Sequence, residues 1–306
     1  MNRKRVLIST TSFAEYDKRP LKMLQDAGLT IKVNRLGRRL KEDEIKRFLS
    51  GIDFLIAGTE PITRDVISSS KALKVISRCG TGIDNIDLTA AGEFGVKVFN
   101  TPCGPTIAVA ELAVGLILNV LRRIGRMDRD IRKGIWDKQM GFLLQGKYAG
   151  IIGFGRIGQR LAQMLLALGA RVAYHDLKDM PHTLDCKPLD LETLLSSCEI
   201  ISIHCPASPD RPIIGAKEFG YIRKGAYLIN TSRGNVIDEE ELYKALKEGR
   251  IAGAGLDVFD KEPYTGKLTE VDNVILTPHI GSYAKEARIG MEMDSVENLL
   301  SYIGRK

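Results

Sequence analysis

The chain has 306 residues, which is enough for two domains that each bury a core of their own. Its 27% charged and 44% hydrophobic residues exclude a disordered or collagen-like chain. The net charge of +7 fits a small phosphate-bearing ligand better than a nucleic acid, because the sequence has no run of five basic residues and no basic patch interleaved with aromatic residues.

The first hundred residues alternate short apolar strands with helical patterns, as parallel βαβ units do. We expect helices over residues 20–28 and 42–51. The strands are expected at residues 5–9, 30–33, 53–58 and 73–77.

A turn-rich segment, NTPCGPT at residues 100–106, ends this first unit. Thr106 can cap a long apolar helix over residues 107–124. A helix that is apolar on most faces is packed between domains or subunits more often than it lies on a surface. Glu111 and Asn119 interrupt its apolar residues, so we do not expect it to span a membrane.

A second series of strands and helices begins at Tyr148. One helix is expected over residues 156–168. Another, over residues 283–302, has no obvious place in the second sheet, so we expect it to return to the first unit. The strands of this series are expected at residues 148–155, 171–176, 199–206, 226–230, 251–258 and 273–278.

The N-terminus and the cysteines indicate the cellular compartment. The residues MNRKR run straight into a short apolar stretch, unlike the longer apolar core of a signal peptide. The five cysteines are scattered and show no CxxC spacing for zinc or redox chemistry. We therefore expect a cytoplasmic protein with no metal site and no membrane partner.

A glycine-rich turn joins the strand that starts at Tyr148 to the helix that follows it. Gly153, Gly155 and Gly158 stand in G-x-G-x-x-G order, and Asp176 ends the next strand eighteen positions later. Gly153 allows the turn, Gly155 lets the backbone approach a pyrophosphate, and Gly158 lets helix and strand pack closely. This combination of strand, turn, helix and acidic residue predicts a dinucleotide site.

The residues around this turn indicate which dinucleotide binds. The amides of Arg156 and Ile157 are expected to face the phosphates at the positive end of the helix. Asp176 favours NAD over NADP because a carboxylate accepts hydrogen bonds from a ribose diol and repels a 2′-phosphate. His175 and Lys178 lie beside it and weaken this preference slightly. The alternative for Asp176 is a strand-terminal aspartate that caps the next turn.

Of the four histidines, His279 is the best placed to carry a proton. In the segment VILTPHIGS it follows a strand and a proline, which puts its imidazole at the carboxyl edge of a sheet, where ligands bind. A nicotinamide enzyme that acts on an alcohol or a carbonyl needs such a proton carrier and a cation for the substrate. Position alone leaves open that His279 is a hydrogen-bonded loop histidine.

Five sequence blocks stand in order along the chain: SRCGTGIDNID at 77–87, NTP at 100–102, NTSRG at 230–234, GAGLDVFDKEP at 253–263 and LTPHIG at 276–281. Together they resemble the D-isomer-specific 2-hydroxyacid dehydrogenase family, and specifically its D-3-phosphoglycerate dehydrogenase branch. The chain is similar to a short form of that branch, without the regulatory C-terminal domain of the longer enzymes, so we expect no serine feedback through such a domain.

The resemblance implies that Arg233, Glu262 and His279 are the catalytic residues. Arg233 would offer a fork of donors to the carboxylate and the carbonyl oxygen of the substrate. His279 would give a proton to the carbonyl oxygen during reduction and take it back during oxidation. Glu262, hydrogen-bonded to the imidazole, would favour its protonated form and fix its orientation. Taken singly, Arg233 also fits a surface cation and Glu262 a turn residue before Pro263.

The resemblance also implies substrate and cofactor contacts. Arg78 matches a basic residue near the substrate phosphate, and Gly80 and Gly82 belong to the loop whose amides bind the carboxylate. Thr81, in the same loop, would meet substrate and cofactor. The other NAD contacts are expected at His204, Cys205 and Pro206 near the adenosine, at Thr231, Ser232 and Asp257 toward the nicotinamide, and at Gly281 and Ser282 beside its ring.

One departure from the family pattern leaves the substrate open. The phosphoglycerate branch commonly carries an Arg-Ser pair after the third strand, whereas this chain has Ala57, Gly58, Thr59 and Glu60 there. Arg64 is a substitute for the missing cation, but Glu60 would oppose a phosphate if it pointed inward.

The sequence therefore leaves three candidate activities for the protein. The first is NAD-dependent oxidation of D-3-phosphoglycerate to 3-phosphohydroxypyruvate, in serine biosynthesis. The second is reduction of another 2-keto acid, such as glyoxylate, hydroxypyruvate or a phosphonate analogue. The third is an NAD(H)-sensing scaffold like the corepressor members of the family, against which the complete triad argues.

The family fold implies the architecture. We expect an α/β protein with two doubly wound parallel sheets, in which a Rossmann-type NAD-binding domain, residues 100–282, is inserted into a flavodoxin-like substrate domain, residues 1–99 and 283–306. Hinges are expected near Asn100 and Ser282. A homodimer is expected through the NAD-binding domain, with the helix after Thr106 at the interface.

Overall fold

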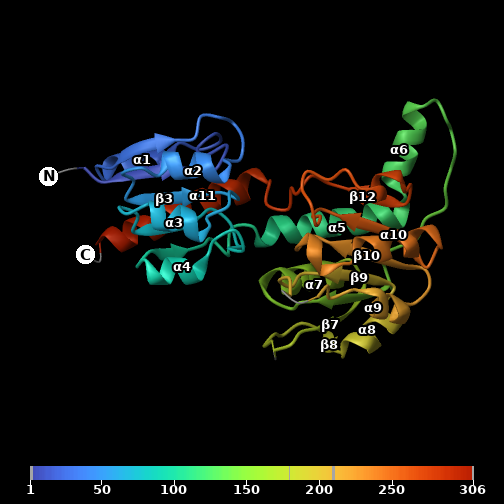
Figure 1. Ribbon diagram of the computed structural model, residues 1–306. Helices are drawn as coiled ribbons and strands as arrows, with labels where there is room; N and C mark the ends of the chain where they lie inside the picture. Colours follow the sequence, from blue (N-terminus) through green and yellow to red (C-terminus); the bar gives the residue numbers. More distant parts are fainter. Residues whose placement is uncertain (1–2, 179, 209–210, 305–306) are drawn as a thin grey trace. The chain divides into compact units, whose positions relative to one another are not determined.

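Two parallel sheets carry the α/β fold, which confirms the predicted fold class. The computed structural model (Figure 1) describes residues 3–178, 180–208 and 211–304. The chain divides into a first unit, Met1–Pro105 with Ser282–Lys306, and a second unit, Thr106–Gly281. The domain limits expected from the sequence stay a prediction, and residues 1–2, 179, 209–210 and 305–306 within them lie outside the described residues.

Five parallel strands form the sheet of the first unit: β1 (Arg5–Ile8), β2 (Thr30–Val33), β3 (Phe54–Ala57), β4 (Val75–Arg78) and β5 (Lys97–Phe99). Their order is β2-β1-β3-β4-β5. The helices of this unit are α1 (Arg19–Asp26), α2 (Glu42–Phe48), α3 (Arg64–Ser69), α4 (Leu88–Glu93) and α11 (Lys285–Gly304).

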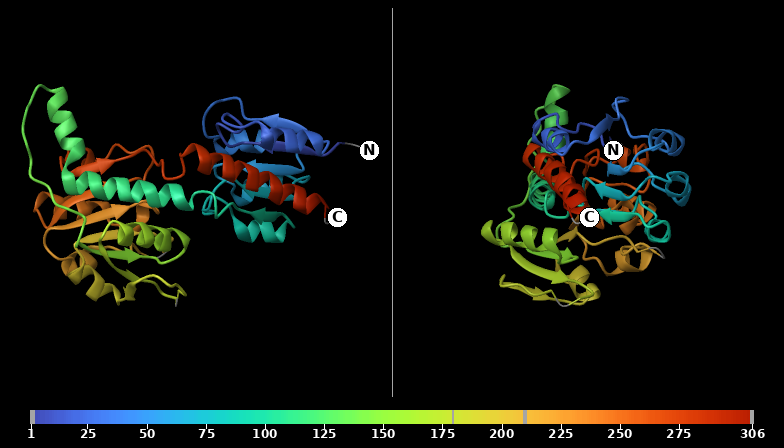
Figure 2. Two further views of the ribbon diagram at one scale, coloured as in Figure 1. Left: turned by 180° about the vertical axis from the view of Figure 1, so that it is seen from behind. Right: turned by 90° about the vertical axis from the view of Figure 1, so that its left-hand side faces the viewer.

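Both faces of this first sheet are covered by helices. Val6 and Ile8 of β1 pack with Leu24 of α1 and Met291 of α11, whereas Leu7 packs into the core on the opposite face. Side chains that alternate along a strand point to opposite faces, so a strand buried on both faces is a continuous apolar run. Figure 2 shows that α11, the last helix of the chain, lies against strands from the N-terminal part of the chain. It contacts α1, β3 and β4.

A buried ion pair fixes α11 to the loop that follows β1. Arg288 donates through Nε to Glu292 Oε1 at 2.9 Å and through Nη2 to Thr10 Oγ1 at 2.9 Å. The backbone N–H of Ala14 donates to Glu292 Oε2 at 2.8 Å. These bonds satisfy two buried charges, which are costly to leave unpaired.

Seven parallel strands form the sheet of the second unit: β6 (Tyr148–Ile152), β7 (Arg171–His175), β8 (Cys186–Pro188), β9 (Ile200–Ile203), β10 (Ala226–Asn230), β11 (Ile251–Leu256) and β12 (Val274–Leu276). Their order is β12-β11-β10-β9-β6-β7-β8. The helical segments are α5 (Thr106–Arg122), α6 (Ile124–Arg132), α7 (Arg156–Ala167), α8 (Leu191–Ser197), α9 (Ala216–Tyr221), α10 (Glu239–Lys247), and the 3₁₀ turns η1 (Gly234–Val236) and η2 (Lys267–Glu270).

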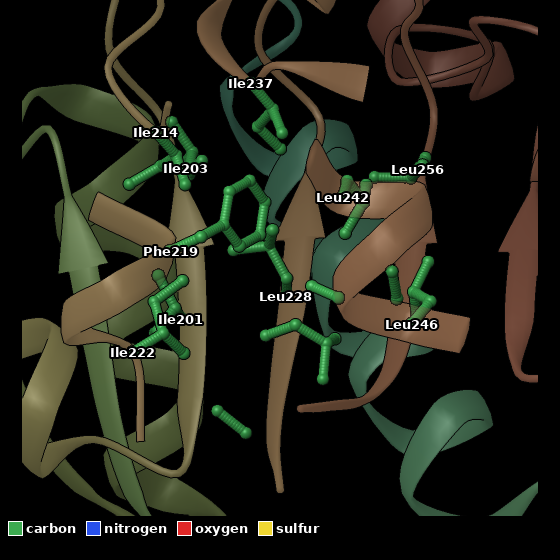
Figure 3. Close-up of a cluster of buried hydrophobic side chains, with 14 of the residues drawn as sticks. Ile201, Ile203, Ile214, Phe219, Ile222, Leu228, Ile237, Leu242, Leu246 and Leu256 are labelled. Atoms are coloured by element: carbon green, nitrogen blue, oxygen red, sulfur yellow. The ribbon is translucent and has the colours of Figure 1, made fainter. Parts of the chain in front are cut away.

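The second sheet is also buried on both faces. Ile201 and Leu228 pack against Phe219 of α9 in the cluster drawn in Figure 3, together with side chains of α8 and α10. Ile200 and Ile229, one position along the same strands, pack into the opposite core beneath α5 and α7. The buried strands leave their carboxyl ends as the sheet edge at which loops can bind ligands.

The long apolar helix expected over residues 107–124 is interrupted. α5 ends at Arg122, and Arg123 adopts a left-handed conformation, φ 53°, before α6 begins. α5 packs against α7, β10, β11 and β12 and leaves Ile107 and Leu118 exposed. Among the described residues, no helix has the length and apolar character needed to cross a membrane.

Candidate active site

The glycine-rich turn between β6 and α7 has the geometry that its sequence predicts. Gly153 has φ +90°, and a Cβ there would lie 2.6 Å from the backbone nitrogen of Cys205. A Cβ on Gly158 would lie 2.2 Å from the carbonyl oxygen of Gly153. A Cβ on Gly155 would meet no described atom within 4 Å. The turn is therefore tight where backbones pack and open at Gly155, as a pyrophosphate requires.

The first turn of α7 and the end of β7 border this opening. Arg156 and Ile157 are the first residues of α7, so their amides have no partner within the helix and lie at its positive end. Asp176 Oδ2 accepts from the Phe154 amide at 2.7 Å, and Oδ1 accepts from the Lys178 amide at 3.0 Å. The carboxylate of Asp176 thus caps the glycine-rich turn and lies beside it. Each of its two oxygens can accept a further hydrogen bond.

Two buried polar atoms lack partners at the carboxyl edge of the second sheet. Among the described residues, His204 Nδ1 after β9 and the Thr231 hydroxyl after β10 accept or donate no hydrogen bond. His204 Nε2 lies 2.7 Å from Ser202 Oγ, and burial lowers the pKa of His204 to about 4, so the imidazole is neutral at pH 7. Unsatisfied buried groups at a ligand-binding edge fit a polar cofactor that would bond to them.

The remaining residues expected near the adenosine follow the same strand. Cys205 lies against Gly153, and Pro206 comes directly after it on the surface. Burial raises the pKa of the Cys205 thiol to about 11, so it stays protonated and uncharged at neutral pH. Cys205 therefore contributes shape to this edge rather than charge.

Asn230 organises the turn that presents Arg233. Its Oδ1 accepts from the backbone N–H of Ser232 at 3.0 Å and from Ser232 Oγ at 2.9 Å, and its Nδ2 donates to the Arg233 carbonyl at 2.8 Å. A Cβ on Gly234 would lie 1.9 Å from the carbonyl carbon of Phe259. Only glycine therefore allows the Arg233 turn to lie against the loop that carries Glu262.

Glu262 and His279 form the pair that the resemblance implies. His279 Nδ1 lies 2.9 Å from Glu262 Oε2 and 3.1 Å from Oε1. Partial burial would raise the pKa of the Glu262 carboxyl, but the hydrogen bond and charge of His279, the Phe259 amide and the Arg233 charge together lower it. Glu262 therefore remains a carboxylate, which fixes the imidazole and leaves its other nitrogen available for proton transfer.

Asp257 holds the loop that carries His279. Its carboxylate accepts from Thr277 Oγ1 at 2.6 Å, from the Ile280 amide at 2.8 Å and from the Gly281 amide at 2.8 Å. His279 itself has φ 55°, a conformation that few non-glycine residues adopt. Burial raises the pKa of Asp257, against the lowering effect of these donors. The three bonds offset the strain at His279 and set the direction of its imidazole.

The substrate loop expected at residues 78–82 follows β4 in the first unit. Arg78 donates through Nη1 to the Cys79 carbonyl, and its guanidinium lies over Gly80, where a Cβ would be 1.6 Å from Nη1. The Gly80 amide donates to Thr101 Oγ1 at 2.7 Å, and the Thr81 carbonyl accepts from Asn100. The Gly80 amide, expected to bind a carboxylate, is thus engaged by Thr101 from outside the loop, while Thr81 is exposed and Gly82 half-buried.

The loop after β3 does not supply a cation. Glu60 is buried, and its carboxylate accepts from Ser9 Oγ and from the Gly58 amide. Arg64 forms a two-pronged ion pair with Glu93, at 2.6 and 2.9 Å, on the surface of α3 and α4. Glu60 therefore points into the first unit, and Arg64 is committed to a carboxylate of the chain itself.

The predicted site residues divide between the two units along the chain. Arg78, Gly80, Thr81, Gly82 and Ser282 belong to the first unit, and all the others belong to the second. Asn230 and Thr277 lie within the blocks NTSRG and LTPHIG, but the sequence patterns assigned neither of them a role. Within the part of the chain that the structure describes, no group of His, Cys, Asp and Glu side chains is arranged to hold a metal ion.

We expect Asp257→Asn to lower kcat about tenfold or more, because an amide oxygen cannot hold all three donors and the His279 loop loosens. Steady-state kinetics and a fluorescence titration of NADH measure the effect, and kcat should change more than the Kd of NADH. Thr277→Val, which removes one donor, is the matched control and should lose less. An unchanged kcat with weakened NADH affinity would limit Asp257 to cofactor binding.

Comparison with known proteins places this geometry in a family. A family model described as D-isomer specific 2-hydroxyacid dehydrogenase, NAD binding domain, matches residues 114–281. A solved structure, the TT0316 protein from Thermus thermophilus, matches 99% of this chain and 97% of its own with a TM-score of 0.91 and 37% identity.

Curated relatives with different substrates match at similar identity. The chain is 40% identical to a hydroxypyruvate reductase from Thermotoga maritima, over 87% of this chain and 89% of that protein. It is 42% identical to a glyoxylate reductase from Thermococcus litoralis, over 80% and 78%. It is 38% identical to a D-3-phosphoglycerate dehydrogenase from Methanocaldococcus jannaschii, over 88% of this chain but 52% of that protein. The chain thus spans about half the length of that dehydrogenase.

Proposed function

The chain belongs to the D-isomer-specific 2-hydroxyacid dehydrogenase family and is an NAD-dependent enzyme of that class, and we propose that it oxidises D-3-phosphoglycerate to 3-phosphohydroxypyruvate. The proposed chemistry depends above all on the His279–Glu262 pair, at 2.9 Å, beside the loop of Arg233. We place this reaction at the start of serine biosynthesis, in the cytoplasm.

The three side chains have separate tasks in this proposal. Arg233 binds the carboxylate and the oxygen at C2 of the substrate with its planar fork of donors. His279 accepts the proton of the C2 hydroxyl during oxidation and returns it to the carbonyl oxygen during reduction. Glu262 stabilises the imidazolium that forms and keeps it pointed at the substrate.

The second unit supplies the residues proposed to hold NAD. The turn Gly153–Gly158 and the amides of Arg156 and Ile157 would hold the pyrophosphate, and Asp176 would accept the ribose hydroxyls. His204 Nδ1 and the Thr231 hydroxyl, each buried without a partner among the described residues, would gain hydrogen bonds. When bound, the nicotinamide supplies the hydride acceptor of the reaction. The other NAD contacts proposed in the second unit are Cys205, Pro206, Ser232, Asp257 and Gly281. Those proposed in the first unit are Thr81 and Ser282.

The first unit carries the proposed substrate contacts, and it supports two candidate substrates. Arg78 lies over the Gly80 backbone, which puts a cation in the substrate loop and favours a phosphorylated acid. The buried carboxylate of Glu60 and the Arg64–Glu93 pair favour a second candidate, reduction of an unphosphorylated 2-keto acid such as glyoxylate or hydroxypyruvate. A negative charge after β3 opposes a phosphate there.

We also propose that the enzyme is a homodimer through its NAD-binding domain. α6 and the segment that follows it carry apolar side chains that are about half exposed or more. Isolated apolar residues are normal on a surface, but several exposed along one segment favour an interface. These side chains are Ile124, Ile131, Ile135, Trp136, Met140, Phe142 and Leu143.

His279→Ala should lower kcat a hundredfold or more and leave NADH binding intact, because it removes the proton carrier alone. Glu262→Gln should keep part of the activity, because the amide can still orient the imidazole but no longer stabilises the imidazolium with a negative charge. Stopped-flow kinetics across pH 5 to 10 measure both. Near-normal turnover of His279→Ala would remove it from the mechanism.

A substrate panel separates the candidate activities. Initial rates with 3-phosphoglycerate, glycerate and lactate, and in reverse with glyoxylate and hydroxypyruvate, should favour the phosphorylated acid, and NAD(H) over NADP(H) because of Asp176. A kcat/KM about a hundredfold higher for unphosphorylated acids would replace the first candidate by the second. No turnover with tight NADH binding would favour a sensing scaffold.

Ile131→Glu combined with Trp136→Glu should convert the dimer to a monomer, because two charges cannot be buried in an apolar interface. Size-exclusion chromatography with light scattering measures the mass. Leu168→Glu, at an exposed apolar residue after α7, is the matched control and should stay dimeric. A monomeric wild type would contradict the proposal.

A further inference from the structure

A polar cavity of about 250 Å³ lies at the amino-terminal edge of the second sheet. Its walls are the end of α5, the start of α6, and the residues that begin β11 and β12; Figure 1 shows α6 leaving the end of α5 near these strands. Because the strands are parallel, this edge is opposite the carboxyl edge that carries the Gly153 turn, Arg233 and His279. The cavity is therefore separate from the catalytic centre.

A strained backbone shapes one wall of the cavity. Arg123 has φ 53°, which costs about 1 kcal/mol or more for a residue with a side chain. Contacts on both sides hold this conformation: the Gly125 amide donates to Asn119 Oδ1 at 2.9 Å, and Arg129 donates to the Asp272 carbonyl at 3.0 Å. Strain of this kind persists where the surrounding structure requires it, most often at ligand sites.

The charges of the lining favour an anion. Arg123 and Arg126 both line the cavity, and Asp272 contributes the one carboxylate among its described lining residues. Arg123 donates to the neutral Gln139 amide at 3.3 Å, and Arg126 lies 3.8 Å from Asp130, which is a long ion pair. The positive end of the nine-residue helix α6 adds to the field. Guanidinium groups match carboxylates and phosphates in geometry as well as in charge.

We propose that this cavity binds a small carboxylate or phosphate anion, held between Arg123 and Arg126. Its volume is slightly below the range of about 300 to 1,000 Å³ typical of drug-sized ligands, so the ligand has few atoms. The site does not use any residue of the proposed catalytic or cofactor machinery. The carboxylate of Asp272 repels an anion, so it lowers the affinity of the cavity for the ligand, whereas the two arginines raise it.

Calorimetric titration of the NADH-saturated protein with inorganic phosphate and with malonate tests the site. Arg123→Gln and Arg126→Gln should each weaken the Kd of the bound probe about tenfold, and Asp272→Asn should tighten it severalfold. Arg132→Gln is the matched control, because Arg132 lies on α6 but pairs with Asp128 outside the cavity lining. The Kd of NADH should not change in any variant. A tighter Kd for phosphate would indicate a phosphate ligand, and a tighter Kd for malonate would indicate a carboxylate ligand.

Three results would overturn the proposal. The first is that neither probe binds at millimolar concentration. The second is that the double variant of Arg123 and Arg126 binds the probes as the wild type does. The third is that Arg132→Gln weakens binding as much as Arg123→Gln and Arg126→Gln do, which would indicate a diffuse charge effect. Light scattering on the same samples tests whether Arg123 and Arg126 instead hold an interface between two copies of the chain. Loss of a dimer without loss of probe binding would assign the arginines to an interface between copies and overturn the anion site.

Discussion

The parallel direction of all the strands in the second sheet is the constraint on which the candidate active site depends. Parallel strands deliver their carboxyl ends to one edge, so the loops after β6, β10, β11 and β12, which are distant in sequence, all lie at that edge. The buried apolar strands fix this edge, because shifting one strand by a residue would exchange the side chains that pack into the two opposite cores. The chemistry of the loops is thus positioned by residues that take no part in it.

Close approach between these loops has a second requirement, which is the absence of side chains at particular points. Gly234 lies where any Cβ would overlap the Phe259 backbone, and Gly153 lies against the Cys205 backbone that follows β9. Hydrogen bonds then replace packing as the local restraint: Asn230 closes the Arg233 turn, and Asp257 closes the His279 loop. Buried carboxylates and amides are well suited to this because each can satisfy several backbone groups at once.

Sequence patterns predict much of this arrangement, and the reasons for the failures are physical. Strand and turn signals identify the two sheets, the Gly153 turn and the His279 segment, because apolar runs and glycine spacing are local properties. The break at Arg123 is not marked by a glycine or proline at that position, and one of the contacts that hold it, between Arg129 and the Asp272 carbonyl, joins residues far apart in sequence. The same holds for the Gly80 amide, whose partner Thr101 is distant in sequence, and for the inward direction of Glu60.

Glu60 shows how a departure from a family pattern gains meaning only from its partners. An acidic residue in a surface loop would be screened by solvent and would affect substrate choice little. Here Ser9 Oγ and the Gly58 amide hold the carboxylate in a buried position, where its charge acts through a medium of low polarity. Arg78, after the adjacent strand β4, brings the opposite charge to the same edge of the first sheet. Under the proposed function, the balance of these two charges, rather than either alone, would decide whether a phosphorylated acid is accepted.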